Sequence, residues 1–413
     1  MKTLVRVILG VLLTAALGSA STPASAAAGP LDLTGELDGV AYEIRVPAAW
    51  NGTLVMYAHG YRDAADHPGE TDDRSAQAFV ADPVEELMLA AGYAVAGSAY
   101  ASNGWAVADG IHDTKALVGF FREHVGKPSV TLLAGFSMGS LVAFESIEKF
   151  GGVYDGVMPS CGVGAGASRT WDSTLAFATA YDAAFGWPAA WGTPADIRDD
   201  LDFESQVVPV VAAELQKPGG GAKLEFMRLA IGAPRGPEWP FTVGFFATEG
   251  RAELERRAGG PVTQNLDHTY DLSAADRAYL AGLGLTDAQL DGWLASMTAS
   301  RVGAVPGPRR YAERYADYTG RVDGPVLTLG TTVDALVIPA QISAYAATVA
   351  DAGRSDLLAS AWVARTGHCN FTPQQLLTGV TALNSWVTTG TRPTDFPSDQ
   401  GFTHFTPPPW PQP

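Results

Sequence analysis

The pentapeptide Gly135-Phe136-Ser137-Met138-Gly139 constrains the fold of this chain more than any other segment. It follows residues 129–134, a short apolar run that predicts a buried strand, and it precedes apolar residues at helical spacing over 141–150. A strand that turns directly into a helix strains the turn residue and crowds the neighbouring backbone, so glycines are needed two positions away. The segment is therefore typical of a nucleophile elbow around Ser137, although a glycine-rich turn would show the same letters.

Strands and helices alternate on both sides of this segment. Short apolar runs predict strands at 40–46, 53–58, 93–98 and 154–159, with helical patterns at 83–91 and 107–125. The alternation resumes near the C-terminus with strands at 325–329 and 358–364 and helices at 339–352 and 373–387. Such alternation builds a parallel sheet with right-handed crossovers and helices on both faces, so the sequence predicts an α/β fold.

A long segment without strand patterns interrupts the alternation. Residues 162–322 show helical patterns broken by Gly or Pro, at 173–185, 195–216, 237–257, 273–281, 286–298 and 308–318. We interpret this segment as a helical cap inserted into the sheet domain, which then comprises residues 31–161 and 323–400. Five of the ten tryptophans lie in the cap, and most of them are expected to form its own core.

The N-terminus has the pattern of a secretory signal. Lys2 and Arg6 precede an apolar run over 7–17, and Ala24-Ser25-Ala26 follows ahead of Ala27. This pattern predicts a signal peptide over 1–26 that is cleaved near Ala26/Ala27, and the apolar run is too short to span a bilayer. We expect a secreted protein without a membrane anchor, the alternative being an uncleaved anchor. At the other end, residues 401–413 form a Pro-rich tail that is expected to be loose.

The formal net charge of −17 argues against nucleic acid or anionic lipid as partners and leaves the oligomeric state open. Five acidic residues follow one predicted strand closely: Asp63, Asp66, Glu70, Asp72 and Asp73. Their spacing fits no ordered calcium loop, so a solvated loop is the favoured interpretation and calcium binding stays open. We predict no metal site and no cofactor.

Two residues downstream are candidate partners of Ser137, because a serine hydroxyl needs a base within reach and a carboxylate to fix that base's tautomer. His368 follows the last strand and stands just before the final helix. Asp334 lies beyond the preceding strand, and the carboxyl ends of parallel strands share one edge of a sheet. Asp323, Asp351 and Asp356 are alternatives, but they precede a strand or end a helix, and Asp334 could instead cap the helix that follows it.

The remaining site predictions concern the oxyanion hole and the pocket. The backbone N–H of Met138 is one expected oxyanion donor and that of Tyr61 the other. His59 is expected to support this loop and is also a possible pocket residue. Residues that follow a strand at the same edge could line a substrate pocket or simply form turns: Ser98, Tyr100, Asn103 and Trp105. His268 in the cap could reach the site if the cap closes, although a surface position is favoured.

The chain has two cysteines, so only one intramolecular pairing exists. Cys161 ends the strand after the elbow helix and Cys369 follows His368, which puts both at the carboxyl edge of the predicted sheet. Secretion permits a disulfide that would hold the His368 loop, the alternative being two free buried thiols.

The strand ending at His59-Gly60-Tyr61, the elbow, the Asp334 loop and Gly367-His368-Cys369-Asn370-Phe371-Thr372 together resemble a secreted bacterial α/β-hydrolase of the serine esterase type. The resemblance covers about residues 35–161 and 323–390 and not the cap. It implies a mostly parallel, eight-stranded sheet with a cap after the sixth strand. A cysteine beside the histidine is also a feature of feruloyl esterases and tannases, which this chain resembles in that respect. In those enzymes the cysteine bonds to a cysteine that precedes the serine, but Phe136 occupies that position here.

The resemblance implies hydrolysis of carboxylic esters through an acyl-enzyme, with a small-molecule or polymeric ester as the substrate. The same triad also serves peptidases, thioesterases and lactonases, and an acyltransferase would use it to deliver the acyl group to an alcohol. A binding module that has lost its activity would usually lack a triad member, and none is missing from this sequence.

Overall fold

The computed structural model describes residues 29–64, 72–236 and 239–410. The predicted signal peptide over 1–26 lies outside this range. Within the described residues, no helix combines the length and apolar character that crossing a membrane would require.

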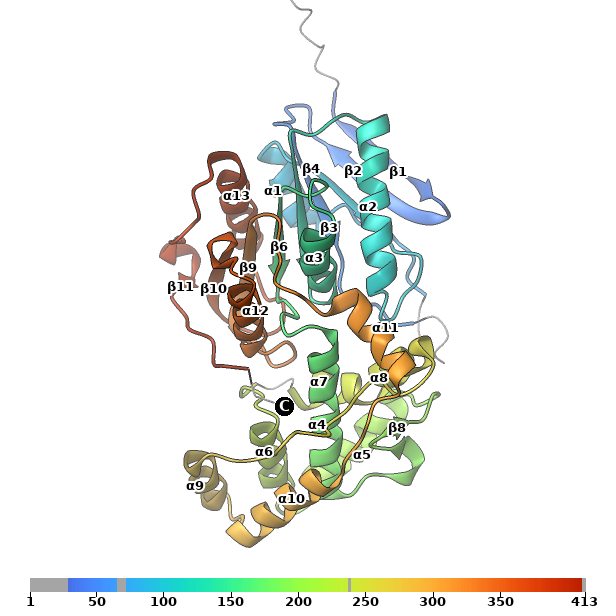
Figure 1. Ribbon diagram of the computed structural model, residues 1–413, viewed down its shortest axis with the longest axis vertical. Coiled ribbons are helices and arrows are strands. Elements are labelled where there is room, and N and C mark those ends of the chain that lie inside the picture. The colour runs from blue at the N-terminus through green and yellow to red at the C-terminus, as the bar shows by residue number, and fades with distance from the viewer. Residues whose placement is uncertain (1–28, 65–71, 237–238, 411–413) are drawn as a thin grey trace, which may run out of the picture.

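A nine-stranded sheet forms the centre of the upper half of the molecule in Figure 1, in the order β1-β2-β4-β3-β5-β6-β9-β10-β11. The strands are β1 (Leu31–Leu37), β2 (Val40–Val46), β3 (Thr53–Ala58), β4 (Ala94–Ser98), β5 (Val130–Phe136), β6 (Gly156–Ser160), β9 (Val326–Val333), β10 (Leu358–Thr366) and β11 (Phe402–Thr403). The six strands from β4 to β10 are parallel, and β1, β2 and β11 run antiparallel to their neighbours.

The central strands read as continuous apolar runs because both of their faces are covered. Every residue of β3 and β5 is buried, which is the usual state of strands in a parallel sheet between helices. Successive residues of β3 pack into the hydrophobic cores on opposite faces of the sheet. Leu54 and Met56 pack on one face, and Val55 and Tyr57 pack on the other. The first side holds α2 (Val107–His124), α3 (Met138–Lys149) and α12 (Ala340–Asp351); the second holds α1 (Asp82–Ala90) and α13 (Pro373–Thr389).

This strand order, with a sharp turn between β5 and α3, is the α/β-hydrolase arrangement, so the predicted fold class is confirmed. The predicted strand number was one too low. Neither β1 nor β11 was among the strands placed from the sequence pattern, and β11 pairs with β10 through only two residue pairs, Phe402 with Val363 and Thr403 with Trp362. So short a strand carries no alternation pattern that a sequence could reveal.

The C-terminal tail is less loose than its composition indicates. Phe405 packs edge-on against Trp362, and the hydroxyl of Ser343 donates to the carbonyl of Pro408 at 2.7 Å. These contacts hold the tail along the sheet domain as far as Pro408, and the described residues end at Trp410.

Between β6 and β9 the chain forms the lower half of the molecule in Figure 1, which is mainly helical. Its helices are α4 (Ala167–Phe185), α5 (Val208–Gln216), α6 (Gly220–Ala230), α7 (Trp239–Ala247), α8 (Glu249–Ala258), α9 (Ala274–Gly282), α10 (Asp287–Ala299) and α11 (Pro306–Ala316). Most of them enclose a second hydrophobic core. The predicted helix over 195–216 is partly wrong, because β7 (Gly192–Thr193) and β8 (Asp196–Ile197) form a hairpin and a π-helical turn precedes α5. The exact domain boundaries stay predictions.

Candidate active site

Ser137 occupies the turn between β5 and α3 with φ 54° and ψ −121°. A positive φ is costly for a residue with a side chain, and it persists here because the strand and the helix fix both neighbours. The flanking glycines have steric causes. A Cβ atom at Gly135 would collide with the carbonyl of Gly139, and one at Gly139 would collide with the carbonyl of Ala58. The turn therefore has the geometry of a nucleophile elbow.

Ser137, His368 and Asp334 form one chain of hydrogen bonds. The ring atom Nε2 of His368 lies 2.8 Å from Oγ of Ser137, and Nδ1 lies 2.7 Å from Oδ2 of Asp334. The other carboxylate oxygen, Oδ1, accepts the backbone N–H groups of Leu336 and Val337, each at 2.9 Å. Asp334 is 2% exposed, so this buried carboxylate is held by two backbone donors while it fixes the histidine ring.

The loops that carry these residues follow neighbouring parallel strands. Asp334 comes directly after β9, and His368 comes two residues after the end of β10. Gly367 links the two loops, because its N–H donates to Val333 and its carbonyl accepts from Thr331. The alternative carboxylates lie elsewhere: Asp323 and Asp356 precede their strands, and Asp351 ends α12.

The expected oxyanion donors lie next to Ser137. Met138 is the first residue of α3, so its N–H has no partner within the helix. Gly60 passes close to the serine, since a Cβ at Gly60 would lie 3.3 Å from Cβ of Ser137. Tyr61 follows directly and lines the same cavity as Ser137. The roles of the Met138 and Tyr61 N–H groups stay predictions.

His59 and Tyr100, two candidate pocket residues, are not among the residues that line the cavity containing Ser137. Their rings stack at 3.8 Å beneath the Tyr61 loop, and both are buried. The two ring nitrogens of His59 face the carbonyls of Gly60 and Ala99, at 2.7 and 3.2 Å. Burial lowers the pKa of His59 to about 4, so the ring is neutral at neutral pH. The pair therefore supports the loop of Gly60 and Tyr61.

Cys161 and Cys369 form a disulfide with their Cα atoms 5.2 Å apart. The bond joins the end of β6 to the residue after His368, and Sγ of Cys369 lies 3.6 Å from Nε2 of the histidine. Cys161, His368 and Cys369 also have metal-ligand atoms within 4.8 Å of one another. Sulfurs that are bonded to each other offer no thiolate, so this group is not a metal site.

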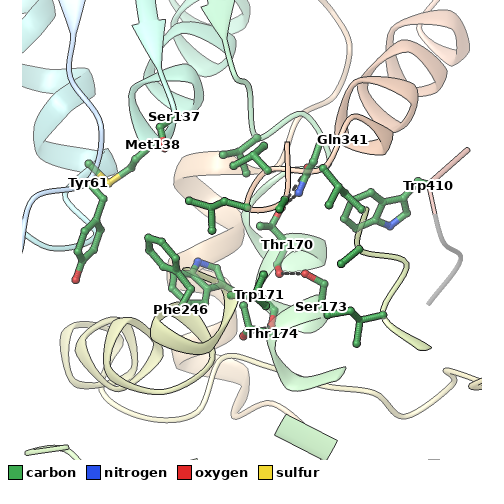
Figure 2. A pocket seen from close by; sticks show the side chains of 18 of the residues that line it. Tyr61, Ser137, Met138, Thr170, Trp171, Ser173, Thr174, Phe246, Gln341 and Trp410 are labelled. Carbon is green, nitrogen blue, oxygen red and sulfur yellow. Dashed lines mark hydrogen bonds between the residues drawn. The ribbon is translucent and has the colours of Figure 1, made fainter. Parts of the chain in front are cut away.

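A cavity of about 860 Å³, counting its open mouth, lies between the sheet domain and the helices below it. We call it the serine cavity, because Ser137 lies in its wall together with Tyr61, Met138 and Trp105. Figure 2 shows Tyr61, Ser137 and Met138 on one side and Gln341 and Trp410 on the other, with Thr170, Ser173 and Thr174 of α4 below them. The lining is mainly apolar and aromatic, with a few hydroxyl and amide groups on α4 and α12, which is the composition expected of a small-molecule site.

Aromatic contacts join the two halves of the molecule over the serine. Trp105 meets Trp171 of α4 at 4.9 Å, edge to face, and Tyr61 meets Phe246 of α7 at 5.3 Å. The N–H of Trp105 donates to Glu253 of α8 at 2.8 Å. Trp105, a candidate pocket residue, lines the serine cavity, and its partners come from the predicted cap segment.

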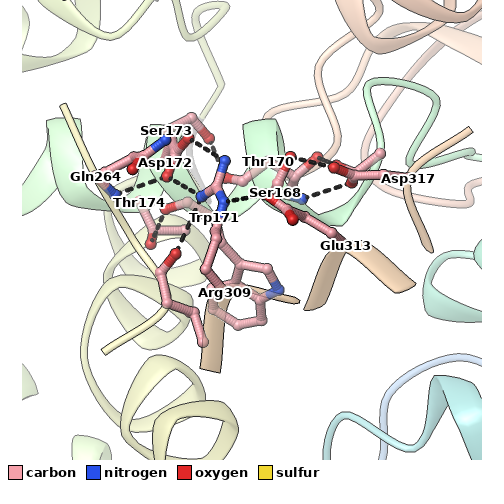
Figure 3. A network of polar contacts seen from close by, with 12 residues as sticks. Ser168, Thr170, Trp171, Asp172, Ser173, Thr174, Gln264, Arg309, Glu313 and Asp317 are labelled. Carbon is pink, nitrogen blue, oxygen red and sulfur yellow. Dashed lines mark hydrogen bonds and ion pairs between the residues drawn. The ribbon is translucent and has the colours of Figure 1, made fainter. Parts of the chain in front are cut away.

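A polar network fixes α4 against α11 (Figure 3). Arg309 binds both carboxylate oxygens of Asp172, at 2.7 and 3.1 Å, and Asp172 also accepts the N–H of Gln264. Ser168 lies one turn before Asp172 on α4, and both its backbone N–H, at 2.9 Å, and its hydroxyl donate to the carboxylate of Asp317. Because α4 forms one wall of the serine cavity, this network sets the position of that wall.

The weaker predictions have mixed outcomes. Asp66 and Glu70 of the acidic loop lie outside the described residues, while Asp72 binds Arg74 and Asp73 binds Ser75. His268 lies in a neighbouring cavity and stacks edge-on with Tyr270. The sequence did not reveal four further residues of the cavity wall, namely Trp171, Phe246, Gln341 and Trp410. From the sequence, the first two belong to the predicted cap, Gln341 to a predicted helix and Trp410 to the Pro-rich tail.

Comparisons with known proteins give distant matches. No protein-family model matches the chain. The o-phthalyl amidase of Xanthobacter agilis is 23% identical over 440 residues, which cover 88% of each chain. Among solved structures, an esterase of Pyrococcus furiosus is 15% identical with a TM-score of 0.39, over 91% of this chain and 93% of the other. An esterase from Aspergillus oryzae is also 15% identical with a TM-score of 0.39, over 86% and 78%. The fold assignment rests on the strand order and the elbow described above.

Proposed function

We propose that this protein is a serine hydrolase that cleaves carboxylic esters through an acyl-enzyme intermediate. The observation that carries the proposal is the unbroken hydrogen-bond chain from Ser137 through His368 to Asp334, at the wall of an apolar cavity. A serine alone is a weak nucleophile at neutral pH, and this arrangement supplies both a base and its orienting carboxylate.

Each residue has one task in the proposed reaction. Oγ of Ser137 attacks the ester carbonyl while Nε2 of His368 takes its proton, and the carbonyl oxygen becomes an oxyanion that the N–H groups of Met138 and Tyr61 bind. His368 then protonates the departing alcohol. In the second half, His368 removes a proton from water as the water oxygen attacks the acyl-enzyme, and it then returns that proton to Oγ of Ser137 as the acid leaves. Asp334 stabilises the imidazolium in both halves without taking its proton.

Amide hydrolysis is the second candidate, and one observation favours it: the relative from Xanthobacter agilis is an o-phthalyl amidase. The same triad cleaves both bond types. An ester and an anilide of one acyl group separate the two candidates, because an amide needs proton donation to a poor leaving group and an activated phenyl ester does not. We expect the ester to react faster by kcat/KM, and a higher value for the anilide would make the protein an amidase.

The first test is a panel of nitrophenyl esters, aryl esters and anilides with Ser137→Ala as the blank. Hydrolysis that needs Ser137 supports the proposal, and undiminished hydrolysis by the variant overturns it. An acyltransferase is tested in the same assay by adding an acceptor alcohol. If the transferred ester then exceeds the free acid among the products, transfer replaces hydrolysis as the reaction.

Secretion is part of the proposal and is supported by the N-terminal pattern and by the disulfide, since such bonds persist in oxidising compartments. N-terminal sequencing of protein recovered from the medium should begin near Ala27. Protein that stays in the cell with Met1 intact would contradict it.

A further inference from the structure

Helix α4 contributes lining residues to the serine cavity and to a second cavity that adjoins it. Thr170 and Thr174 on one face of the helix line the serine cavity, while Arg169 and Asp172 on the adjacent face line the second. Ser173 lies between these faces and lines both. We call the second space the side cavity; it measures about 830 Å³ counting its open mouth.

The two cavities also share walls outside α4. Ile231, which follows α6, and Trp410 of the C-terminal tail line both of them. Figure 2 places Trp410 on the far side of the serine cavity from Ser137. A substrate bound at Ser137 that extends past Ser173 and Trp410 would therefore reach the side cavity.

Arg169 is a half-buried cation in the side cavity. Its Nε donates to the carbonyl of Ala165 at 2.7 Å, which fixes the guanidinium on the helix. The two Nη atoms make no hydrogen bond or ion pair within the described residues. The free edge of the guanidinium carries parallel N–H groups, and a planar carboxylate is the group that such an edge binds with two hydrogen bonds.

The acidic groups of the side cavity do not neutralise Arg169. Asp172 is occupied by both arms of Arg309 and by the N–H of Gln264, as Figure 3 shows. Asp271 is exposed to solvent, and its charge acts on Arg277. The side-chain amide of Gln264 also lines the cavity and makes no hydrogen bond within the described part of the chain, so it can supply a further donor.

We propose that the side cavity binds a carboxylate carried by the substrate, remote from the bond that is cleaved, and that Arg169 is its principal anchor. The inference rests on the proposed hydrolase function and adds a substrate class to it: esters or amides of acids that bear a second, free carboxylate. Arg169 contributes to binding and not to the chemical step.

The test uses two nitrophenyl esters with acyl chains of equal length, the hemiester of adipic acid and the neutral ester of hexanoic acid. Arg169→Gln should raise KM for the hemiester about tenfold and leave KM for the hexanoate within about twofold, because only the hemiester loses a charged hydrogen bond. Its kcat should change little for either ester. Arg169→Lys keeps the charge and loses the two-pronged geometry, so its KM for the hemiester should lie between the values of wild type and Arg169→Gln.

A matched control removes an arginine of the neighbouring helix. Arg310 of α11 is exposed and lines neither cavity, so Arg310→Gln should leave both KM values unchanged. A KM increase of equal size for both esters in Arg169→Gln, or none for the hemiester, would overturn the side-cavity assignment. Failure of the wild-type protein to cleave either ester would instead count against the hydrolase proposal.

A binding measurement gives a readout that does not depend on turnover. Monomethyl adipate, which keeps one free carboxylate, should raise the melting temperature of Ser137→Ala, the neutral methyl hexanoate should raise it less, and Arg169→Gln in the same background should abolish the difference. An equal shift by both esters in the Ser137→Ala protein would contradict the assignment.

Discussion

Cys369 is bonded to Cys161 and is also the neighbour of His368, so the loop that carries the proposed base is tied covalently to the end of β6. Both cysteines have positive φ angles, 43° and 50°. The bond joins residues 208 positions apart in the sequence. The loop is thereby held by two different means, the disulfide and the hydrogen bonds of Gly367.

Removal of the disulfide should lower both stability and turnover. Cys161→Ala/Cys369→Ala should lose about 2–4 kcal/mol in the free energy of unfolding, because the unfolded chain regains the freedom that the long closed loop had removed. The kcat should fall more than KM rises, since the base loosens while the serine cavity keeps its walls. Denaturant melts and steady-state kinetics check both effects. Labelling of free thiols at both positions in the unreduced wild-type protein would contradict the bond itself.

The carboxylate of Asp334 is expected to act by fixing the tautomer of His368. Asp334→Asn keeps the size of the side chain but presents a donor or a neutral oxygen to Nδ1, so kcat should fall by about 10³–10⁴-fold with little change in KM. Asp323→Asn is the matched control, because Asp323 precedes β9 and lies away from the histidine. Equal losses in the two variants would remove Asp334 from the proposed triad.

Trp410 should determine how well large substrates bind. Trp410→Ala opens the wall shared by the two cavities, and loss of an aromatic contact is expected to raise KM for aryl esters about tenfold. Acetate esters should be unaffected, because Figure 2 places Trp410 far from Ser137. Trp410→Phe should restore most of the binding. A loss of kcat for every substrate would mean that the tail supports the fold and not the pocket.

Stability should fall as the pH rises toward neutrality, and Glu145 of α3 is one cause. Burial raises the pKa of Glu145 to about 7 from its usual 4.5, against the opposing effect of Lys149. Between these two values the folded protein keeps a proton that the unfolded chain releases, so this stabilisation is complete below pH 4.5 and is lost as the pH rises through 7.

Glu145→Gln removes this titration. The variant should be more stable than wild type at pH 8 by about 1–3 kcal/mol, and its unfolding free energy should depend less on pH between 5 and 8. Chemical denaturation at a series of pH values measures both quantities. Parallel curves for the two proteins would show that Glu145 is ionised in the native state throughout this range.

The sequence predicted the features that depend on local rules. The elbow is recognisable because a side chain at Gly135 would collide with the carbonyl of Gly139, and one at Gly139 with the carbonyl of Ala58. The order of serine, aspartate and histidine follows from the order of the parallel strands. The apolar strands were recognisable because both of their faces are covered. These features need no knowledge of distant contacts.

The cavity walls could not be predicted, because they depend on how distant segments meet. Trp171 and Phe246 read as core residues of a helical segment, and Trp410 reads as part of a proline-rich tail. Tyr100 follows a strand at the correct edge, but its ring stacks on His59 behind the loop instead of entering the cavity. Helical periodicity shows which residues share a face, and only the fold shows what that face contacts.

Trapping of the acyl-enzyme tests the central claim most directly. The protein is mixed with excess nitrophenyl acetate, quenched in acid within the first turnovers, digested and analysed by mass spectrometry. The account predicts one acetyl group on the peptide that contains Ser137 in the wild-type protein and none in Ser137→Ala. His368→Ala acylates slowly and is therefore left longer with the ester, and we expect the acetyl group on Ser137 to accumulate to a greater amount in this variant. Acetylation at another residue with hydrolysis preserved in Ser137→Ala would contradict it.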